Sequence, residues 1–564
     1  MKYINKVVVS GIALALATAS CADLDTNSYT KYEGGLVSAD QKRVALQNKA
    51  ELASASVTGS FSAFYKPLSH WTGHLDFGYS ATMIGYDIMT EDYISKDSGY
   101  NWFASFQEYA GGRDDTYPAA MLWFYQYEQI KVCNDILTTI TADAVENNNE
   151  LKFYRAQALA LRSFDYWTLA QVYAFNYDGY ADAPCVPLLT DENANEVAVE
   201  GCARSTVAET YELIMKDINE AIELLDNNPV KPTDVIDTQS KRLVSKAVAY
   251  GLRARYNLSM HKYAEAAQDA QSAIAAFDGR PYSAEEVSAP GFTSMSDPSW
   301  MWAIAISETQ DGIAGGSLVN FPSMTCSFVH GYVDQGGVWK WCSKKLYDRI
   351  PSSDVRKGWW LDENRKSRNL TAAQQAYLDK FNTGTPNYGP DASLNLMPYT
   401  NVKFGPYQGV IGTALNASDV PLMRIEEMYL TLAEAQAMSG NLAGGKQTLE
   451  SFIKTYRNPQ YSCLANSAEA FQDECWFQRR VELWGEGLAY FDTMRLHKDI
   501  DRVGCTFPSS SVFQIKYGDP ARLTLIPNDE TSANKKIAPY SEGAVTANTN
   551  NKPFPQPDPV PDQY

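Results

Sequence analysis

The chain has 564 residues, of which 45% are hydrophobic and 20% charged, a composition that excludes wholesale disorder and allows a substantial core without disulfide or metal scaffolding. Its 48 basic and 67 acidic residues give a formal net charge of −19. Because so acidic a surface repels phosphate backbones, nucleic-acid binding is disfavoured. Aromatic residues reach 12%, and these rings are a better guide to ligand chemistry than charge.

Residues 1–20 have the layout of a secretory signal peptide. Lys2 and Lys6 form a basic start, an apolar run follows at 7–17, and small residues precede Cys21. The apolar run is too short to span a bilayer unaided. The arrangement at Cys21 resembles a bacterial lipobox, in which the thiol is diacylated before cleavage, although Thr18 stands where such boxes usually carry Leu. The alternative is an ordinary secreted protein cleaved nearby.

Acylation of Cys21 predicts a protein held on a membrane surface. Each buried methylene of an acyl chain contributes about 0.8 kcal/mol, so several chains on Cys21 give a stable anchor. The acidic residues Asp23 and Asp25 resemble a signal for display on the outer leaflet in some Gram-negative bacteria. No later stretch approaches the ~18 apolar residues of a membrane helix. We therefore expect an anchored protein, with residues 21–38 as a polar tether.

The remaining cysteines are even in number and contain no Cys-x-x-Cys pair, which gives no support to a zinc ribbon or a redox motif. In an exported chain, a disulfide between Cys185 and Cys202 would close a short loop. Most of the eight are expected to be small buried hydrophobes. They are Cys133, Cys185, Cys202, Cys326, Cys342, Cys463, Cys475 and Cys505.

Helical periodicity is clear in the first half of the chain. Residues 117–140 carry an apolar stripe, and residues 151–174 form a long aromatic-rich helix. Thr206 and Glu209 have the spacing of a capping box that opens a further helix. One face of that helix is apolar. It comprises Tyr211, Ile214, Ile218, Ala221 and Leu225.

Two helical hairpins share one template at distant positions, residues 247–276 and 428–452. Small residues such as Ala254 and Ala266 allow two antiparallel helices to approach closely. The spacing resembles a tetratricopeptide unit, the alternative being generic antiparallel helices. The template positions are Tyr250, Ala254, Ala266, Ala270 and Ala273 in the first hairpin and Tyr429, Ala433, Gly445, Leu449 and Phe452 in the second.

Two long stretches between the hairpins, residues 70–116 and 278–420, are rich in Gly, Pro, Trp and Tyr. We call them the first and second insertions. Irregular connections of such length in a compact domain usually carry function. Residues 468–495 are largely helical, interrupted by two glycines, and the Pro-rich tail 544–564 is expected to be extended or mobile.

The insertions have the composition of a sugar-binding surface. A glycan presents an apolar face of C–H bonds and a rim of hydroxyl groups, so it is recognised by flat aromatic rings together with amide, carboxylate or guanidinium groups. Both insertions supply this combination, although each ring has the alternative of lying in the core. The candidate ligand-binding residues are Tyr100, Asn101 and Trp102 in the first insertion, and Trp339 and Trp341 in the second.

Catalytic and metal motifs are weak. The sequence has no Gly-x-Ser-x-Gly elbow, phosphate-binding loop, dinucleotide fingerprint or His-Glu-x-x-His. His70 and His74 lie four apart near Asp76, but Gly73 between them disfavours a regular helix, so no metal site is predicted. No cofactor is predicted either. The sequence contains carboxylate pairs, but it does not show the ~5–10 Å separation that glycoside hydrolysis requires.

Charged residues near the end of the chain are interpreted as structural anchors. Glu482 and Arg480, beside Trp484, predict buried or half-buried ion pairs that lock the last helix against its neighbours. Arg424 with Glu426 or Glu427 is expected to anchor one helix to another in the same way.

Four segments, in order, resemble the SusD/RagB family of outer-membrane nutrient-binding lipoproteins. The last two are the most specific, and with the lipobox-like start the resemblance spans nearly the whole chain. Leu488, Ala489 and Tyr490 replace the more polar residues often seen there. The segments are Tyr154 to Tyr173 with the Pro184–Pro187 turn, Ser245 to Tyr256, Pro421 to Ala435, and Arg479 to Leu483 followed by Glu486-Gly487, Phe491-Asp492 and Arg495.

The resemblance implies a mainly α fold, a right-handed superhelix of four tetratricopeptide-like helix pairs, with a loop-rich ligand-binding subdomain inserted. Residues 39–564 would form this SusD-like domain. It also implies a partner, a SusC-type TonB-dependent transporter, on which the lipoprotein sits as a lid at the exterior of the outer membrane. The expected function is capture of oligosaccharides for that transporter, without covalent chemistry and without a cofactor.

Three alternatives remain at this point. Some RagB-like relatives handle peptides, although abundant Trp in both insertions favours glycans. A surface glycoside hydrolase built on helical repeats would release new reducing ends from polysaccharides. A purely structural adaptor would have all its aromatic rings in the core, so the solvent exposure of Trp102, Trp339 and Trp341 separates that case.

Overall fold

A computed structural model describes most of residues 44–515, together with residues 562–563. The predicted signal peptide, Cys21, the tether and nearly all of the tail 544–564 lie outside the described residues. Within 44–515, the gaps are residues 47–48, 63, 66–72, 98, 110–116, 175, 195, 198–201, 237, 310–318 and 383–394.

The described part is mostly helical, which confirms the predicted fold class. Successive helices pack side by side: α6 on α7, α7 on α10, α12 on α13, α13 on α18, and α18 on both α19 and α20. The right-handed superhelix of four pairs stays a prediction. The main helices are α3 (Ser54–Ser62), α4 (Tyr79–Ile88), α6 (Tyr117–Thr139), α7 (Asn149–Tyr173), α10 (Val207–Leu225), α12 (Lys246–Ser259), α13 (Tyr263–Ala276), α18 (Ile425–Met438), α19 (Leu442–Tyr456), α20 (Ala468–Glu482) and α21 (Ala489–Arg495).

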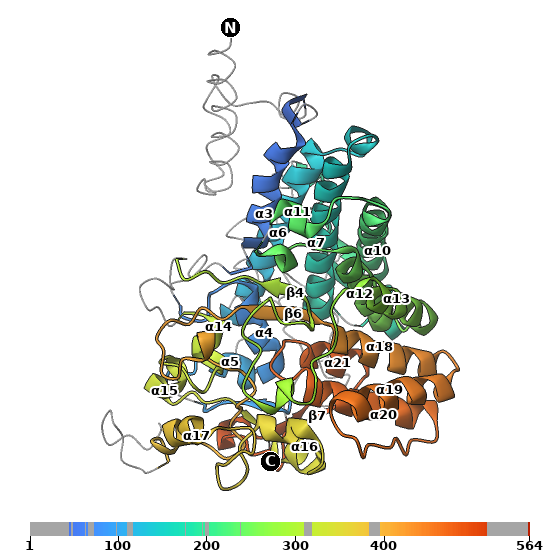
Figure 1. Ribbon diagram of the computed structural model, residues 1–564. Coiled ribbons are helices and arrows are strands. Elements are labelled where there is room, and N and C mark those ends of the chain that lie inside the picture. Colours follow the sequence, from blue (N-terminus) through green and yellow to red (C-terminus); the bar gives the residue numbers. More distant parts are fainter. Residues whose placement is uncertain are drawn as a thin grey trace.

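The insertions lie against this helical frame (Figure 1), with α14, α15 and α17 on the side opposite α18–α20. Their short helices are α5 (Ala104–Gln107), α14 (Phe321–Thr325), α15 (Tyr332–Gly336), α16 (Lys344–Arg349), η5 (Val355–Trp359) and α17 (Ala372–Asp379). The first insertion is less irregular than expected, because residues 79–88 form α4, every residue of which is buried. A helix buried on all sides has no amphipathic pattern, which is why periodicity missed it.

Small antiparallel strand pairs join distant segments. Strand β1 (Tyr93–Ile94) in the first insertion pairs with β5 (Trp341–Cys342) in the second. Strand β4 (Trp300–Ile304) of the second insertion pairs with β6 (Val420–Arg424), which leads into α18. In the rest of the described chain, β2 (Pro184–Pro187) pairs with β3 (Arg204–Thr206), and β8 (Phe513–Ile515) with both β7 (Ile500–Asp501) and β9 (Asp562–Gln563). The β1–β5 pair holds the two insertions together.

Local sequence signals explain the main helix boundaries. The Thr206 side chain accepts the Glu209 N–H and the Glu209 carboxylate accepts the Thr206 N–H, so the predicted capping box is confirmed. The five predicted apolar positions of α10 are all buried. Between α20 and α21, Gly485 and Gly487 adopt φ of 78° and 76°, in the left-handed region where glycine carries little steric cost. A Cβ at Gly487 would lie 2.7 Å from Met83.

Both predicted helical hairpins are present. Ala254 and Ala266 are fully buried where α12 and α13 meet, as close helix approach requires. In the second hairpin, Gly440 turns the chain at φ 99°. Gly445 packs so tightly that a Cβ would lie 2.5 Å from the Ala433 carbonyl oxygen. Small residues therefore set the distance between the helices of each pair.

The described cysteines are all free, so the disulfide considered between Cys185 and Cys202 is not formed. Seven of the eight are buried, which confirms their interpretation as small hydrophobes. In the part of the chain that the structure describes, no helix combines the length and the apolar character needed to cross a bilayer.

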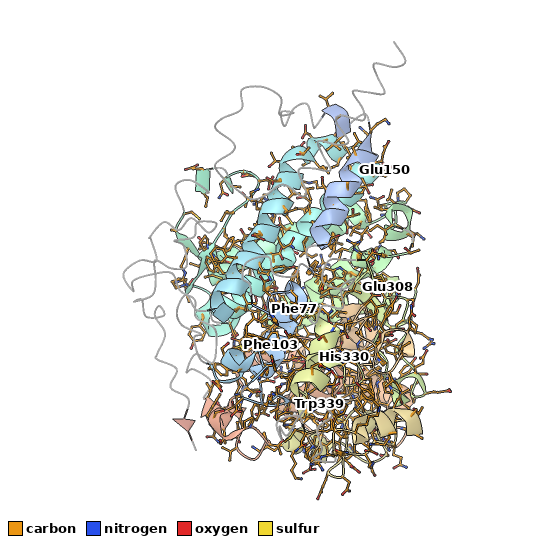
Figure 2. The ribbon with its side chains drawn as sticks, turned by 90° about the vertical axis from the view of Figure 1, so that its left-hand side faces the viewer. Phe77, Phe103, Glu150, Glu308, His330 and Trp339 are labelled. Atoms are coloured by element: carbon orange, nitrogen blue, oxygen red, sulfur yellow. The ribbon has the colours of Figure 1, made fainter. Side chains whose placement is uncertain are left out.

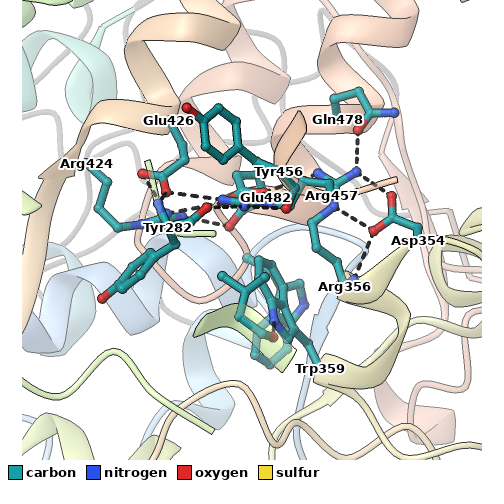
Figure 3. Close-up of polar contacts among 12 residues, drawn as sticks. Tyr282, Asp354, Arg356, Trp359, Arg424, Glu426, Tyr456, Arg457, Gln478 and Glu482 are labelled. Atoms are coloured by element: carbon teal, nitrogen blue, oxygen red, sulfur yellow. Dashed lines mark hydrogen bonds and ion pairs between the residues drawn. The ribbon is translucent and has the colours of Figure 1, made fainter. Parts of the chain in front are cut away.

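A buried ionic network surrounds Glu482 (Figure 3). Its carboxylate is fully buried and accepts hydrogen bonds from Arg457 at 2.8 Å, Arg424 at 3.2 Å and Arg356 at 3.3 Å. Although burial opposes ionisation, these three guanidinium groups hold the pKa of Glu482 well below its usual range. Glu482 thereby joins the end of α20 to β6, to the end of α19 and to η5.

The predicted anchors are confirmed: Arg424 pairs with Glu426 as expected, and its other partners and those of Arg480 were not identified from the sequence. Arg480 pairs with Glu91 and Asp92 in the first insertion, each at 2.5 Å. The Trp484 indole N–H donates to the Asp92 carbonyl at 2.7 Å. Arg424 pairs with Glu426, Glu482 and Glu486.

We predict that Glu482→Ala lowers the free energy of unfolding by about 3–5 kcal/mol, because it leaves three buried guanidinium groups without their shared carboxylate. Thermal and urea unfolding monitored by circular dichroism measure the change. Asp135→Ala is the matched control, since the Lys131–Asp135 pair is exposed and contributes less than about 1 kcal/mol. Equal melting of the Glu482→Ala variant and the wild type would contradict the anchor role.

Candidate ligand-binding site

Aromatic rings from the two insertions meet at one place, which we call the aromatic cluster: His74, Tyr100, Trp102 and Tyr332. Ring centroids are 6.1 Å apart for Tyr100–Tyr332 and 6.5 Å for Trp102–Tyr332. His74 lies 4.7 Å from Trp102 and 5.6 Å from Tyr332. The first three residues belong to the first insertion, whereas Tyr332 opens helix α15 in the second. The cluster is therefore a product of the contact between the insertions.

The backbone around the cluster is tied across the same contact. The Lys96 ammonium donates to the Gly336 carbonyl, and the Asn101 amide donates to the Lys96 carbonyl. Tyr100 packs directly on α15, where a Cβ at Gly336 would lie 2.9 Å from the Tyr100 Cβ. Only glycine leaves room for the Tyr100 side chain at this distance. These contacts set the position of Tyr100 relative to Tyr332.

Tyr100 is the open ring of the cluster. Its side chain is 56% exposed, the largest exposure of any aromatic residue among those described. Trp102 is half-buried, while Asn101 and Tyr332 are buried. An exposed ring supported from below by further rings is a suitable platform for the apolar face of a sugar.

Polar side chains surround His330, at the N-terminal side of α15. His330 Nδ1 lies 3.3 Å from Asp334 Oδ2 and 2.7 Å from the Gln335 amide nitrogen. The Tyr377 hydroxyl donates to Asp334 at 3.3 Å. The Gly331 backbone N–H donates to the other Asp334 oxygen at 2.9 Å. The amide of Gln335 and the carboxylate of Asp334 thus lie on the same short helix as Tyr332, and the His330 imidazole lies just before it, as recognition of hydroxyl groups requires.

A second pair of polar side chains, Tyr407 and Glu308, involves the loop 407–416, which hydrogen-bonds to the residues just before α15. The His330 N–H donates to Thr413 at 2.8 Å, which ties residues 407–416 to the start of α15. On this loop the Tyr407 hydroxyl donates to Glu308 at 2.7 Å.

In Figure 2, His330 and Phe103 lie in the lower half of the molecule, and Glu150 at the start of α7 lies at the upper end.

The structure contradicts the expectation that Trp339 and Trp341 are exposed platforms. Trp339 is 0% exposed and packs against Phe381 at 5.1 Å between ring centroids. Trp341 is 3% exposed, lies in β5, and donates its indole N–H to the Thr506 carbonyl at 3.2 Å. Both rings belong to the core of the second insertion, because neighbouring segments cover both faces of β5. Neither ring offers a free face to a ligand.

The three candidates of the first insertion have different positions. Tyr100 is open to solvent, Trp102 packs within the cluster, and Asn101 bridges backbone groups. Their contact with a ligand stays a prediction. Sequence reasoning missed Tyr332, which opens a short helix without amphipathic periodicity, and His330, which lies just before that helix. The flanking Gly331 and Gly336 were the available signal for a close approach of two segments.

No metal site is apparent in this region of the described chain. His74 contacts the rings of Trp102 and Tyr332, and His70 lies outside the described residues. Across the described residues, no group of three or more His, Cys, Asp or Glu side chains is placed to hold a metal ion.

A cavity without aromatic lining lies elsewhere in the described part of the chain. It has a volume of about 330 Å³ between the start of α7 and the end of α10. Its lining includes Lys152, Glu220, Glu223 and Leu224 but no aromatic residue. Because it offers no ring to stack on a sugar, the aromatic cluster is the better candidate for glycan binding.

Lys340, between the two buried tryptophans, is an unusual core residue. It is 1% exposed, and its ammonium donates to Ser95 at 3.1 Å and to the Val338 carbonyl at 3.0 Å. Burial, together with the nearby charge of Lys96, lowers the pKa of Lys340 to about 7. The buried amine therefore opposes folding most strongly when it is protonated.

We predict that Lys340→Met stabilises the protein at pH 6 and that this gain shrinks as pH rises. Lysine in the unfolded chain has a pKa of about 10.4, so between pH 7 and that value the unfolded state binds more protons and wild-type stability rises with pH. The Met variant lacks this pH dependence. Urea unfolding of both proteins at pH 6, 8 and 9.5 measures the difference in their free energies of unfolding. A difference that does not change with pH would show that Lys340 is not a titrating core group.

Comparison with known proteins gives consistent matches over most of the chain. A family model described as starch-binding and associating with the outer membrane matches residues 77–258. The model of the SusD family matches residues 309–556. No curated protein matches the chain.

Solved structures show the same fold. A SusD-like carbohydrate-binding protein from Bacteroides vulgatus is 24% identical, with a TM-score of 0.62 over 80% of this chain and 84% of that one. A SusD superfamily protein from Bacteroides thetaiotaomicron is 20% identical, with a TM-score of 0.62 over 81% and 91%. Surface glycan-binding protein A from the same species, in complex with laminarihexaose, is 18% identical, with a TM-score of 0.56 over 82% and 95%.

Proposed function

The chain belongs to the SusD/RagB family, and from this premise we propose that it is a cell-surface lipoprotein that binds oligosaccharides and delivers them to a SusC-type TonB-dependent outer-membrane transporter. One observation carries the glycan proposal. It is the exposed Tyr100 ring, held at the contact of the two insertions beside Tyr332, with amide and carboxylate groups on the adjoining helix and an imidazole just before it. The related surface protein that holds laminarihexaose supports the same ligand class.

The aromatic cluster suits binding better than covalent chemistry. Asp334 is buried and already accepts hydrogen bonds from Gly331 and Tyr377, so it is engaged in holding α15. A glycoside hydrolase needs one carboxyl group that donates a proton and a second that acts from the opposite side of the bond. We propose no such pair here. Binding is expected to be modest in affinity, because each sugar hydroxyl exchanges water for a protein partner.

Attachment to the membrane follows from the first residues of the mature chain. Acyl chains on Cys21 would hold the protein on the outer membrane, and the polar tether 21–38 would let the body move while its anchor stays fixed. In the proposed mechanism the body closes over the transporter with the ligand between them, and the ligand is then released inward.

We predict that Tyr100→Ala weakens oligosaccharide binding roughly 2- to 12-fold, the loss expected for one aromatic contact. Isothermal titration with a panel of neutral oligosaccharides measures the dissociation constant. Tyr250→Ala is the matched control, since this half-buried tyrosine on α12 lies outside the aromatic cluster.

Two results would contradict this assignment. Binding of peptides but of no sugar would support the RagB-like alternative. New reducing ends after incubation with polysaccharides would show a hydrolase.

We also predict that Cys21→Ala moves the protein from the membrane fraction to the soluble fraction, because the acyl chains supply its membrane affinity. Fractionation of cells followed by immunoblotting checks the shift. The wild-type protein is expected to co-purify with a large β-barrel protein after the envelope is solubilised. Retention of the Cys21→Ala variant in the membrane would exclude Cys21 as the sole anchor, and a wild-type protein that purifies alone would count against the transporter partnership.

A further inference from the structure

One segment of this acidic chain is strongly basic. Residues 344–368 contain eight basic and four acidic residues, whereas the whole chain carries a formal charge of −19. The segment comprises α16, η5 and the turns that follow, near the lower end of the molecule in Figure 1. The residues are Lys344, Lys345, Arg349, Arg356, Lys357, Arg365, Lys366 and Arg368 against Asp348, Asp354, Asp362 and Glu363.

Some charged residues of this segment are buried in ion pairs, and the others are half-buried or exposed to solvent. Arg356 and Asp354 pair with each other inside the protein, at 1% and 3% side-chain exposure. Lys344, Lys345, Arg349 and Arg368 are exposed, and Lys357 is half-buried. We call these last five residues the basic face.

The ion pairs of the basic face leave it largely open. Lys344 pairs with Asp348, and Lys345 pairs with Asp501, but both pairs lie at the surface with side chains about half exposed. Exposed pairs of this kind are weak and exchange readily with other partners. Their charges are therefore available to an incoming anion.

The other three cations have no carboxylate partner within ion-pair distance in the described chain. The Arg349 guanidinium lies over the Phe477 ring at 4.2 Å. Lys357 donates only to carbonyl groups, those of Tyr347 at 3.1 Å and Ile350 at 2.7 Å. Arg368 likewise donates to the carbonyls of Ser352 and Asp354. These contacts orient the cations without neutralising them.

Three cations of the basic face, Lys344, Lys357 and Arg368, lie close enough to repel one another. Burial lowers the pKa of Lys357, Asp348 opposes the shift, and the positive charges of Arg368 and Lys344 lower it further. A negative group placed between these cations would relieve their mutual repulsion. The arrangement thus favours an anionic partner over a neutral one.

Aromatic rings accompany the cations. Tyr347 on α16 lies 5.0 Å from Tyr399 between ring centroids, and the Lys357 ammonium lies 4.5 Å over the Tyr347 ring. The cavity between α7 and α10 is not lined by the basic face. An open surface with spaced cations and adjoining rings fits an extended polymer whose acidic groups recur along its length and whose sugar rings present apolar faces.

We propose that the basic face is a second ligand surface, separate from the aromatic cluster, that binds acidic polysaccharides carrying carboxylate or sulfate groups. The proposal rests on the proposed glycan-binding function and extends it to a polymer class. The basic face would hold the polymer by its charges while the aromatic cluster binds neutral sugar units.

The test is affinity electrophoresis of the full chain in gels containing polygalacturonate or neutral laminarin, at 25 and 300 mM salt. We expect retardation by polygalacturonate at low salt and its loss at high salt, because the contacts are solvent-exposed charges. The double variant Lys344→Glu and Arg349→Glu should weaken this binding about tenfold or more. The control variant Lys216→Glu and Lys454→Glu, with the same charge change at exposed sites on α10 and α19, should bind as the wild type does.

Three results would overturn the proposal: no retardation of the wild type at low salt, equal weakening in the control variant, or equal retardation by DNA, which would show a general affinity for polyanions. Tyr100→Ala separates this proposal from the glycan-binding function. It should weaken laminarin binding and leave polygalacturonate binding unchanged. A wild-type protein that binds polygalacturonate but not laminarin counts against the aromatic cluster only. A wild-type protein that binds laminarin but not polygalacturonate counts against the basic face only.

Discussion

The buried ionic network around Glu482 is the constraint on which the rest of the structure depends. Four cations, Arg356, Lys403, Arg424 and Arg457, meet four carboxylates, and every member is buried. A charge at this depth is tolerated only when its partners are in place, so the segments that carry them form together or not at all. Those segments belong to the helical frame and to the second insertion. The carboxylates are Asp354, Glu426, Glu482 and Glu486.

The first insertion is held by the same kind of contact. Arg480 of α20 binds Glu91 and Asp92, while the buried Arg502 donates to backbone carbonyls, among them those of Ile88 and Met89 at the end of α4. With both insertions fixed to the frame, β1 and β5 can pair and α15 can meet the turn at Tyr100. The aromatic cluster is thus positioned by charges that lie well inside the protein, and a rigid site follows from a rigid core.

The two proposed ligand surfaces separate two kinds of recognition. The aromatic cluster offers one open ring and groups that exchange hydrogen bonds with hydroxyls, which suits neutral sugars. The basic face offers three cations without a carboxylate partner in the described chain and two in exposed pairs, within an otherwise acidic molecule, which suits a charged polymer. Negative charge elsewhere would repel such a polymer, so it would be directed to one side of the protein. Most other tryptophans of the second insertion, such as Trp359 and Trp360, stabilise its core.

Sequence alone determined the features that depend on neighbouring residues: the helices with apolar periodicity, the capping box at Thr206, both hairpins and the family resemblance. It also indicated buried anchors at Arg424, Arg480 and Glu482, although among their partners it identified only Glu426 for Arg424. Tertiary structure decided which rings are open. In a strand, alternation places Trp339 and Trp341 on the face opposite Lys340, and one face is expected to be exposed. All three are buried, because segments distant in sequence cover both faces of β5. The residues next to β5 in the sequence do not indicate this burial.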